Sequence, residues 1–242
     1  MASEKSRGVI INHVNYSETS VVCNIFTREH GLLGFMMKGL RRGKGAIKSS
    51  HIMPLNLVDI IFDNKPNQQL LILKELHCNP LLMGLHGEMH KNALSIFMSE
   101  VLQKTLYKEH VDQSLFDHLE STIIYINRVQ NIANIPCYFL LKLALFMGFK
   151  PKGGWQPEEQ LMLDVFDGIF TNIVKKEHLQ LSVDASRYIY NLLNSRIEEQ
   201  EVLSQLYQTR IEALDGMVDY FQFHILNQKK IISHQILHDI LK

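Results

Sequence analysis

Short runs of alternating apolar and polar residues, separated by turn-forming residues, occupy the first 76 positions of the chain. Alternation over about four to eight residues, with many β-branched side chains, is typical of a half-buried β-strand. The pattern predicts a set of five strands, at residues 9–14, 20–27, 32–38, 55–62 and 70–76. We expect these strands to close into a small barrel of the OB type, which leaves no free sheet edge.

Beyond Asn79-Pro80 the period changes, and apolar residues recur every three or four positions, as on one face of a helix. Helices are expected at residues 88–107, 113–129, 136–147, 184–195, 199–206, 211–227 and 233–241. The third of them starts at Pro136, stops at Gly148 and is apolar almost all round. We therefore expect this helix at the buried centre of the helical part.

An irregular segment, about residues 150–174, interrupts the helices and contains the only tryptophan, Trp155. Two short apolar runs flank Asp167-Gly168, a dipeptide typical of a hairpin turn. The predicted fold class is α+β: a five-stranded OB-type β-barrel followed by a mainly α-helical domain with a small hairpin insertion. The expected domains are residues 1–79, for nucleic-acid binding, and residues 80–242.

Composition narrows the class of protein. Of the 242 residues, 46% are hydrophobic, and no apolar run approaches the roughly 18 to 20 residues of a membrane-spanning helix. No hydrophobic segment follows the first charges, so we expect no signal peptide. Three widely spaced cysteines argue against a disulfide framework and favour a reducing cytoplasm.

The net charge of zero conceals an asymmetry. Residues 1–80 hold ten Lys or Arg and six Asp or Glu, a charge of +4, so residues 81–242 hold fifteen and nineteen, a charge of −4. The segment 38–51, KGLRRGKGAIKSSH, has five of the cations, three glycines and no acid. Its glycine spacing does not match a phosphate-binding P-loop. A flexible cationic loop beside a barrel favours contact with a phosphate backbone, with a solvated loop tip as the alternative.

Candidate catalytic and metal sites are weak. His86 and His90 are four residues apart, as are His234 and His238, but each pair lacks further ligands at a zinc-site spacing. No sequence signature of a nucleophile is present, and Cys23 and Cys137 are expected to pack in cores. We predict a protein that is not an enzyme, without a metal or a cofactor. A metal-dependent hydrolase would depend on the histidine pairs alone.

Several motifs, in order along the chain, resemble the RecO family of bacterial recombination mediators. The matching segments are YSETS at residues 16–20, FTREHG at 26–31, KGLRR at 38–42, FMGFKP at 146–151 and KIISHQIL at 230–237. Many members carry four cysteines after that proline as a zinc-binding module, whereas this chain has none there. We expect packing around Trp155, Phe166 and Phe170 to replace the zinc.

The resemblance implies a mediator of DNA repair and homologous recombination that binds single- and double-stranded DNA and anneals complementary strands. It also implies that the protein, together with RecR, helps to load the recombinase onto DNA coated by single-stranded-DNA-binding protein, whose acidic C-terminal tail it engages. Such a protein would act in the cytoplasm, at the nucleoid, and would not contact a membrane. We see no coiled-coil seam that demands a dimer, and a monomer is expected.

The family motif carries over Lys38, Arg41 and Arg42 as DNA contacts. Charge and position along the chain add four more candidates: Lys44, Lys48, Arg7 and Arg28. Lys104, Arg128 and Lys142 interrupt apolar helical faces and are candidates for the acidic tail, although their stems could equally reach from a core to solvent. We expect the basic loop to be mobile. The alternative function is a protein-interaction adaptor whose basic barrel binds an acidic peptide or protein in place of DNA.

Overall fold

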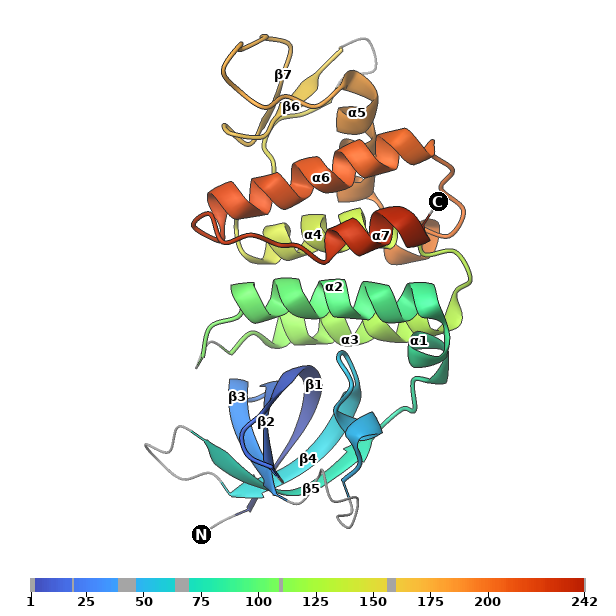
Figure 1. Cartoon of the computed structure of the whole chain (residues 1–242). Coiled ribbons are helices and arrows are strands. Elements are labelled where there is room, and N and C mark those ends of the chain that lie inside the picture. The colour runs from blue at the N-terminus through green and yellow to red at the C-terminus, as the bar shows by residue number, and fades with distance from the viewer. Residues whose placement is uncertain are drawn as a thin grey trace. The chain divides into compact units, whose positions relative to one another are not determined.

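A computed structural model describes residues 3–18, 20–38, 47–63, 70–108, 111–155 and 160–241. The chain forms two compact units, Met1–Asn127 and Arg128–Lys242 (Figure 1). The first unit contains the barrel together with the helices up to residue 127. The expected domains, residues 1–79 and 80–242, divide the chain at a different place. That residues 1–79 fold by themselves stays a prediction.

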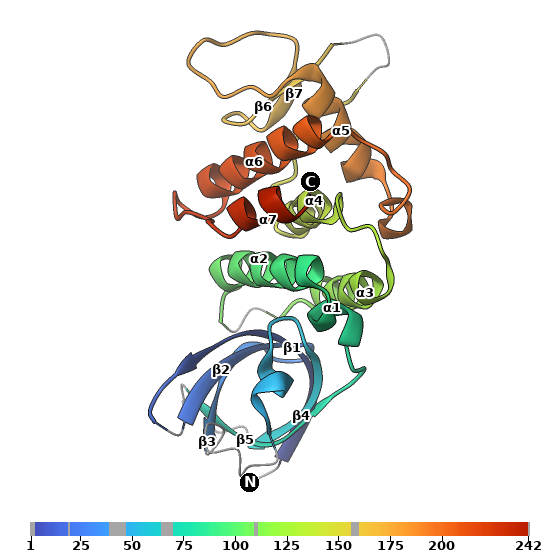
Figure 2. The same cartoon turned by 45° about the vertical axis from the view of Figure 1, so that its right-hand side comes forward.

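Five strands form the closed barrel that the alternating pattern predicts (Figure 2). They are β1 (Ser3–Asn15), β2 (Ser20–Thr27), β3 (Gly31–Lys38), β4 (Leu57–Asp63) and β5 (Leu71–Cys78). The order around the barrel is β1-β2-β3-β5-β4. Only the pairing of β3 with β5 is parallel among these strands, and it closes the barrel. Strand β1 begins earlier than predicted, because its polar first half pairs with β4 from Ser3 onward.

The barrel encloses an apolar core. Phe35 and Phe62 are fully buried, and their rings meet edge to face with centroids 5.2 Å apart. Cys23 is also fully buried, and burial raises the pKa of its thiol to about 12, so packing is its role, as predicted. Gly31 has a φ of 68°, which lets β2 turn tightly into β3.

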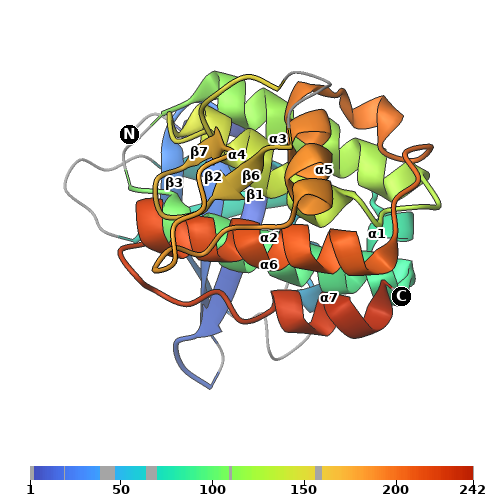
Figure 3. The ribbon, with the colours of Figure 1, turned by 90° about the horizontal axis from the view of Figure 1, so that it is seen from above.

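The remaining elements are mostly helices. They are α1 (Met83–Gly87), α2 (Met89–Thr105), α3 (Gln113–Arg128), α4 (Ile135–Phe146), α5 (Val183–Asn194), α6 (Tyr207–His224) and α7 (His234–Ile240). The predicted hairpin forms β6 (Met162–Asp164) and β7 (Ile169–Thr171). In the second unit α4, α5 and α6 pack on one another (Figure 3), and most of α4 is buried, as expected. Within the described residues, no helix is long and apolar enough to cross a membrane.

One predicted helix, at residues 199–206, is wrong. A short 3₁₀ turn covers Ile197–Glu199, and residues 203–206 have no regular structure. The side chain of Asn134 explains the difference, because its Nδ2 donates to the carbonyl oxygens of Gln200 and Leu203, both at 2.8 Å. Those carbonyls are therefore bonded outside the segment in which the helix was predicted.

Candidate nucleic-acid interface

The basic loop begins and ends on the barrel. Lys38 is the last residue of β3 and pairs with Ser20 of β2. Ile47, where the described chain resumes, packs against the barrel core. The side chain of Lys38 and the whole of Arg41, Arg42 and Lys44 lie outside the described residues, as does the expected mobility of residues 39–46. The barrel thus fixes both ends of the segment that carries the loop cations.

Lys48 is the loop cation that the structure describes completely. It is exposed and directly precedes a 3₁₀ turn at Ser49–Ile52. No acidic side chain of the described residues forms an ion pair with it, and its neighbours Ser49 and Ser50 are exposed and uncharged. Lys48 is therefore a solvated cation, a state suited to phosphate contact by counterion release.

Arg7 and Arg28 have a different environment, because both form ion pairs with acids of α3. Arg28 makes a two-pronged contact with Asp117, with distances of 2.8 and 3.0 Å. Arg7 contacts Glu120 and also lies 3.5 Å from Asp59. The hydrogen bond from Arg28 holds the pKa of Asp117 below its ordinary value. These two guanidinium groups fasten α3 to the barrel, and the acids neutralise much of their charge.

We expect Arg28→Ala to change affinity for single-stranded DNA less than Lys48→Ala does. Lys48 has no described acid to leave before it contacts a phosphate, whereas Arg28 must break its contact with Asp117. Loss of one phosphate contact should reduce the slope of log affinity against log salt by about 0.7 for single strands. Fluorescence anisotropy with a labelled oligonucleotide, at several salt concentrations, measures both slopes. An equal reduction in the two variants would place Arg28 at the interface.

The three candidates for an acidic tail are not gathered at one place within a compact unit. Lys104 belongs to the first unit and pairs with Glu100 at 2.5 Å, whereas Arg128 and Lys142 belong to the second. The Nζ of Lys142 donates to the carbonyl oxygen of Leu193 at 2.9 Å, and burial lowers its pKa. Arg128 is exposed at the end of α3, so it is the candidate that its surroundings leave most accessible.

Aromatic packing supports the hairpin, partly as expected. Trp155 and Phe170 pack together, with ring centroids 6.1 Å apart, and Tyr190 of α5 completes this cluster. Phe166 lies in a second cluster: it is 40% exposed, and its ring centroid is 4.3 Å from that of Phe223 in α6. The three predicted aromatic residues therefore divide between one cluster that includes Tyr190 of α5 and another that includes Phe223 of α6.

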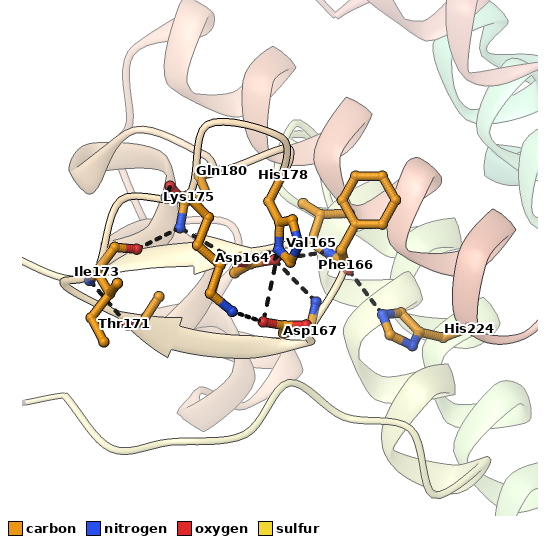
Figure 4. Close-up of polar contacts among 10 residues, drawn as sticks. All are labelled: Asp164, Val165, Phe166, Asp167, Thr171, Ile173, Lys175, His178, Gln180 and His224. Carbon is orange, nitrogen blue, oxygen red and sulfur yellow. Dashed lines mark hydrogen bonds and ion pairs between the residues drawn. The ribbon is translucent and has the colours of Figure 1, made fainter.

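A polar network lies at the hairpin turn, where the sequence pattern predicts only the turn itself (Figure 4). At its centre is the fully buried side chain of Asp164, whose Oδ1 accepts hydrogen bonds from the backbone N–H groups of Phe166 and Asp167 at 3.1 and 3.0 Å. The Nδ1 of His178 lies 2.8 Å from its Oδ2, and Gln180 contacts the same oxygen at 3.4 Å. We call these five residues the Asp164 network.

The Asp164 network does not fit the zinc module of the family. The ligand atoms of Asp164, Asp167 and His178 do come within 4.8 Å of one another. However, the set has no thiolate, and the Asp164 oxygens already accept bonds from protein donors. The ammonium group of Lys175 forms an ion pair with the carboxylate of Asp167. The hairpin is thus cross-linked by protein groups, and the signal in the sequence was Asp164 placed just before the Asp167-Gly168 turn.

The histidine pairs have acidic or amide neighbours. The Nε2 of His86 lies 2.9 Å from the Oδ1 of Asn56, while His90 lies 3.3 Å from Glu88. His86 and His90 therefore face different partners, and neither arrangement resembles a metalloprotease site. His234 and His238 both face Asp215 of α6, at 3.7 and 2.9 Å, and so join α7 to α6.

Comparison with known proteins identifies the family. The N-terminal model of recombination protein O matches residues 1–79, and its C-terminal model matches residues 86–153. Proteins named DNA repair protein RecO align with nearly the whole chain. The relative in Christiangramia forsetii is 24% identical over 97% of this chain and 98% of its own length. The relative in Phocaeicola vulgatus is also 24% identical, over 98% of both chains. The closed barrel, the loop that leaves β3 and the buried helix α4 all lie inside the matched segments, and the chain belongs to the RecO family of DNA repair proteins.

Proposed function

We propose that this protein binds single- and double-stranded DNA at the loop end of its barrel and anneals complementary strands without catalysing a reaction. The observation that carries the proposal is the loop itself, which holds five cations and no acid and is anchored to the barrel at both ends. Lys48, exposed and without a described acidic partner, represents the state that phosphate binding requires.

Annealing follows from charge neutralisation. Two complementary strands repel one another through their phosphates, and a protein that binds both strands through Lys and Arg reduces this repulsion. Phosphate contacts carry no sequence information, so any complementary pair would be served. The sequence places glycine, the residue with the widest choice of backbone conformation, at positions 39, 43 and 45.

We extend the proposal to the partners that membership of the family implies. The protein would work at the nucleoid with RecR, engage the acidic C-terminal tail of single-stranded-DNA-binding protein, and help to load the recombinase. The exposed guanidinium of Arg128 supports an acidic partner on the second unit. Arg128→Ala should therefore weaken binding of an acidic tail peptide more than Lys142→Ala does.

The decisive experiment is annealing of two labelled complementary oligonucleotides by the wild type and by Arg41→Ala/Arg42→Ala, at low and moderate salt. We expect the double variant to lose about 10- to 100-fold in affinity for single strands at low salt, with a salt slope shallower by about 1.4, because two phosphate contacts are lost. Annealing should fall in parallel.

Lys176→Ala/Lys229→Ala is the matched control, because it removes the same charge from exposed positions of the second unit. Normal annealing by the arginine variant would move the DNA site away from the loop. A wild type that binds an acidic peptide, but neither binds nor anneals DNA, would establish the adaptor function in its place.

A further inference from the structure

The turn between β1 and β2 presents an aromatic ring to solvent. Tyr16 is 64% exposed, and Val14, two residues earlier, is 54% exposed. Figures 2 and 3 show the tip of this hairpin, in dark blue, standing clear of the barrel wall. The end of β1 and the turn after it therefore display two large side chains to solvent.

Among the described residues, the turn is held together without the Tyr16 ring. The turn is built by backbone groups, since the N–H of Tyr16 donates to the carbonyl oxygen of Ser20 at 2.9 Å and the N–H of Ser17 to the same oxygen at 3.2 Å. The hydroxyl of Ser17 accepts from the N–H of Ser20 at 3.2 Å. Within the described part of the chain, the Tyr16 side chain has no hydrogen bond and no ring contact. Its aromatic face is free to bind a ligand.

The register of the barrel places Tyr16 two strands away from Lys38, the last residue before the basic loop. Tyr16 bonds to Ser20, and Ser20 pairs directly with Lys38 on the other side of β2. Two strand spacings separate Tyr16 from Lys38, a backbone distance of about 10 Å. One DNA strand could therefore contact both the ring and the loop.

We propose that Tyr16 is a stacking platform for an unpaired base of single-stranded DNA. The inference rests on the proposed function and assigns to the β1–β2 turn a task that the cationic loop cannot perform. Cations of the loop hold phosphates, which single strands and duplexes share, whereas a ring can stack only on a base that is already unpaired. Tyr16 thus adds affinity for single strands alone and holds the stacked base exposed until a complementary strand arrives.

A second exposed tyrosine provides a matched control. Tyr107 is 63% exposed, so the two rings present nearly the same aromatic surface. Its neighbour Lys108 bridges to Leu32, at the start of β3, whereas the loop leaves β3 at its end, Lys38. Tyr107 therefore belongs to the opposite end of that strand and should not reach DNA held by the loop.

The test compares affinities of the full-length wild type, Tyr16→Ala, Tyr16→Phe and Tyr107→Ala for oligo(dT) and for a duplex of equal length. We expect Tyr16→Ala to bind oligo(dT) about 5- to 100-fold more weakly, with duplex affinity within twofold and the salt slope for oligo(dT) unchanged. Tyr16→Phe and Tyr107→Ala should bind as the wild type does. Oligo(dT) affinity that is unchanged in Tyr16→Ala, or an equal loss for both forms of DNA, would overturn the inference.

Photocross-linking tests the same inference on the wild type, so the result does not depend on whether a variant folds. An oligonucleotide with 5-iodouracil should cross-link to Tyr16 of the wild type on irradiation, as mapped by mass spectrometry, and a cross-link found only elsewhere would count against stacking. The outcomes also separate the two proposals. If Tyr16→Ala weakens binding while Arg41→Ala/Arg42→Ala does not, the stacking site stands and the loop assignment fails. If the arginine variant alone weakens binding, the loop stands and the stacking site fails.

Discussion

Asp164→Ala is expected to lower the free energy of unfolding of the second unit by about 3 kcal/mol. The carboxylate is fully buried, and its loss leaves the N–H groups of Phe166 and Asp167 and the imidazole of His178 without their acceptor. These three hydrogen bonds are partly buried, so each unsatisfied donor should cost about 1 kcal/mol, the lower end of the range for buried groups. Urea unfolding of the full-length chain measures the loss, and hydrogen exchange at residues 162–181 localises it.

Asp167→Ala is the control, because Asp167 is partly exposed and pairs with Lys175 at the surface. Its removal should cost less than about 1 kcal/mol. A metal chelator should leave the unfolding midpoint of the wild type unchanged, since the hairpin is cross-linked by protein groups. A large fall in the midpoint with chelator, or equal losses in the two variants, would contradict the role assigned to the Asp164 network.

The same network predicts the sign of an acid effect. Burial alone would raise the pKa of Asp164, but the backbone N–H of Asp167 and the side chain of His178 outweigh it, and the pKa is lowered. A lowered carboxyl pKa contributes stability that is present above the unfolded value, about 3.9, and is lost as pH falls through the folded value. Asp164→Asn should therefore flatten the stability profile below about pH 4.

The barrel could be predicted from the sequence because period-two alternation specifies one buried face. The ends of β2 were predicted to the residue. Helix α1, with five residues, is too short for a helical period to be detected. The prediction of a helix at residues 199–206 was wrong for another reason. The carbonyl oxygens of Gln200 and Leu203 accept hydrogen bonds from Asn134, which lies more than 60 residues earlier. Local pattern carries no information about such distant bonds.

The candidate interface shows the same limit. Sequence identifies a cation but not its partner, so Arg7 and Arg28 were grouped with Lys48 although α3 supplies acids to both arginines. Those acids are about 90 to 110 residues away in the chain. Tyr16 was visible within the YSETS motif, but only the register of Ser20 with Lys38 places it near the end of β3. Residue type is local, whereas the neighbours of a side chain depend on the whole fold.

Asn134→Ala is expected to lower the free energy of unfolding by about 4 kcal/mol, more than Asp164→Ala does. The buried side chain of Asn134 donates to the carbonyl oxygens of Gln200 and Leu203, and its Oδ1 accepts the hydroxyl of Tyr188 at 2.7 Å. Burial raises the pKa of Tyr188, so this hydroxyl stays protonated and must donate. Alanine would leave two carbonyls and one hydroxyl unsatisfied in the interior and add a small cavity.

Asn131 offers a matched control three residues earlier. It is exposed, and its Nδ2 donates to the carbonyl oxygen of Glu201 at 3.2 Å, so Asn131→Ala should cost less than about 1 kcal/mol. Because Asn134 holds the 200–203 segment against the start of α4, its loss should also increase hydrogen exchange there, while the barrel strands keep their protection. Equal unfolding energies for the two variants would show that the segment is held by apolar packing, and that the absence of the predicted helix has another cause.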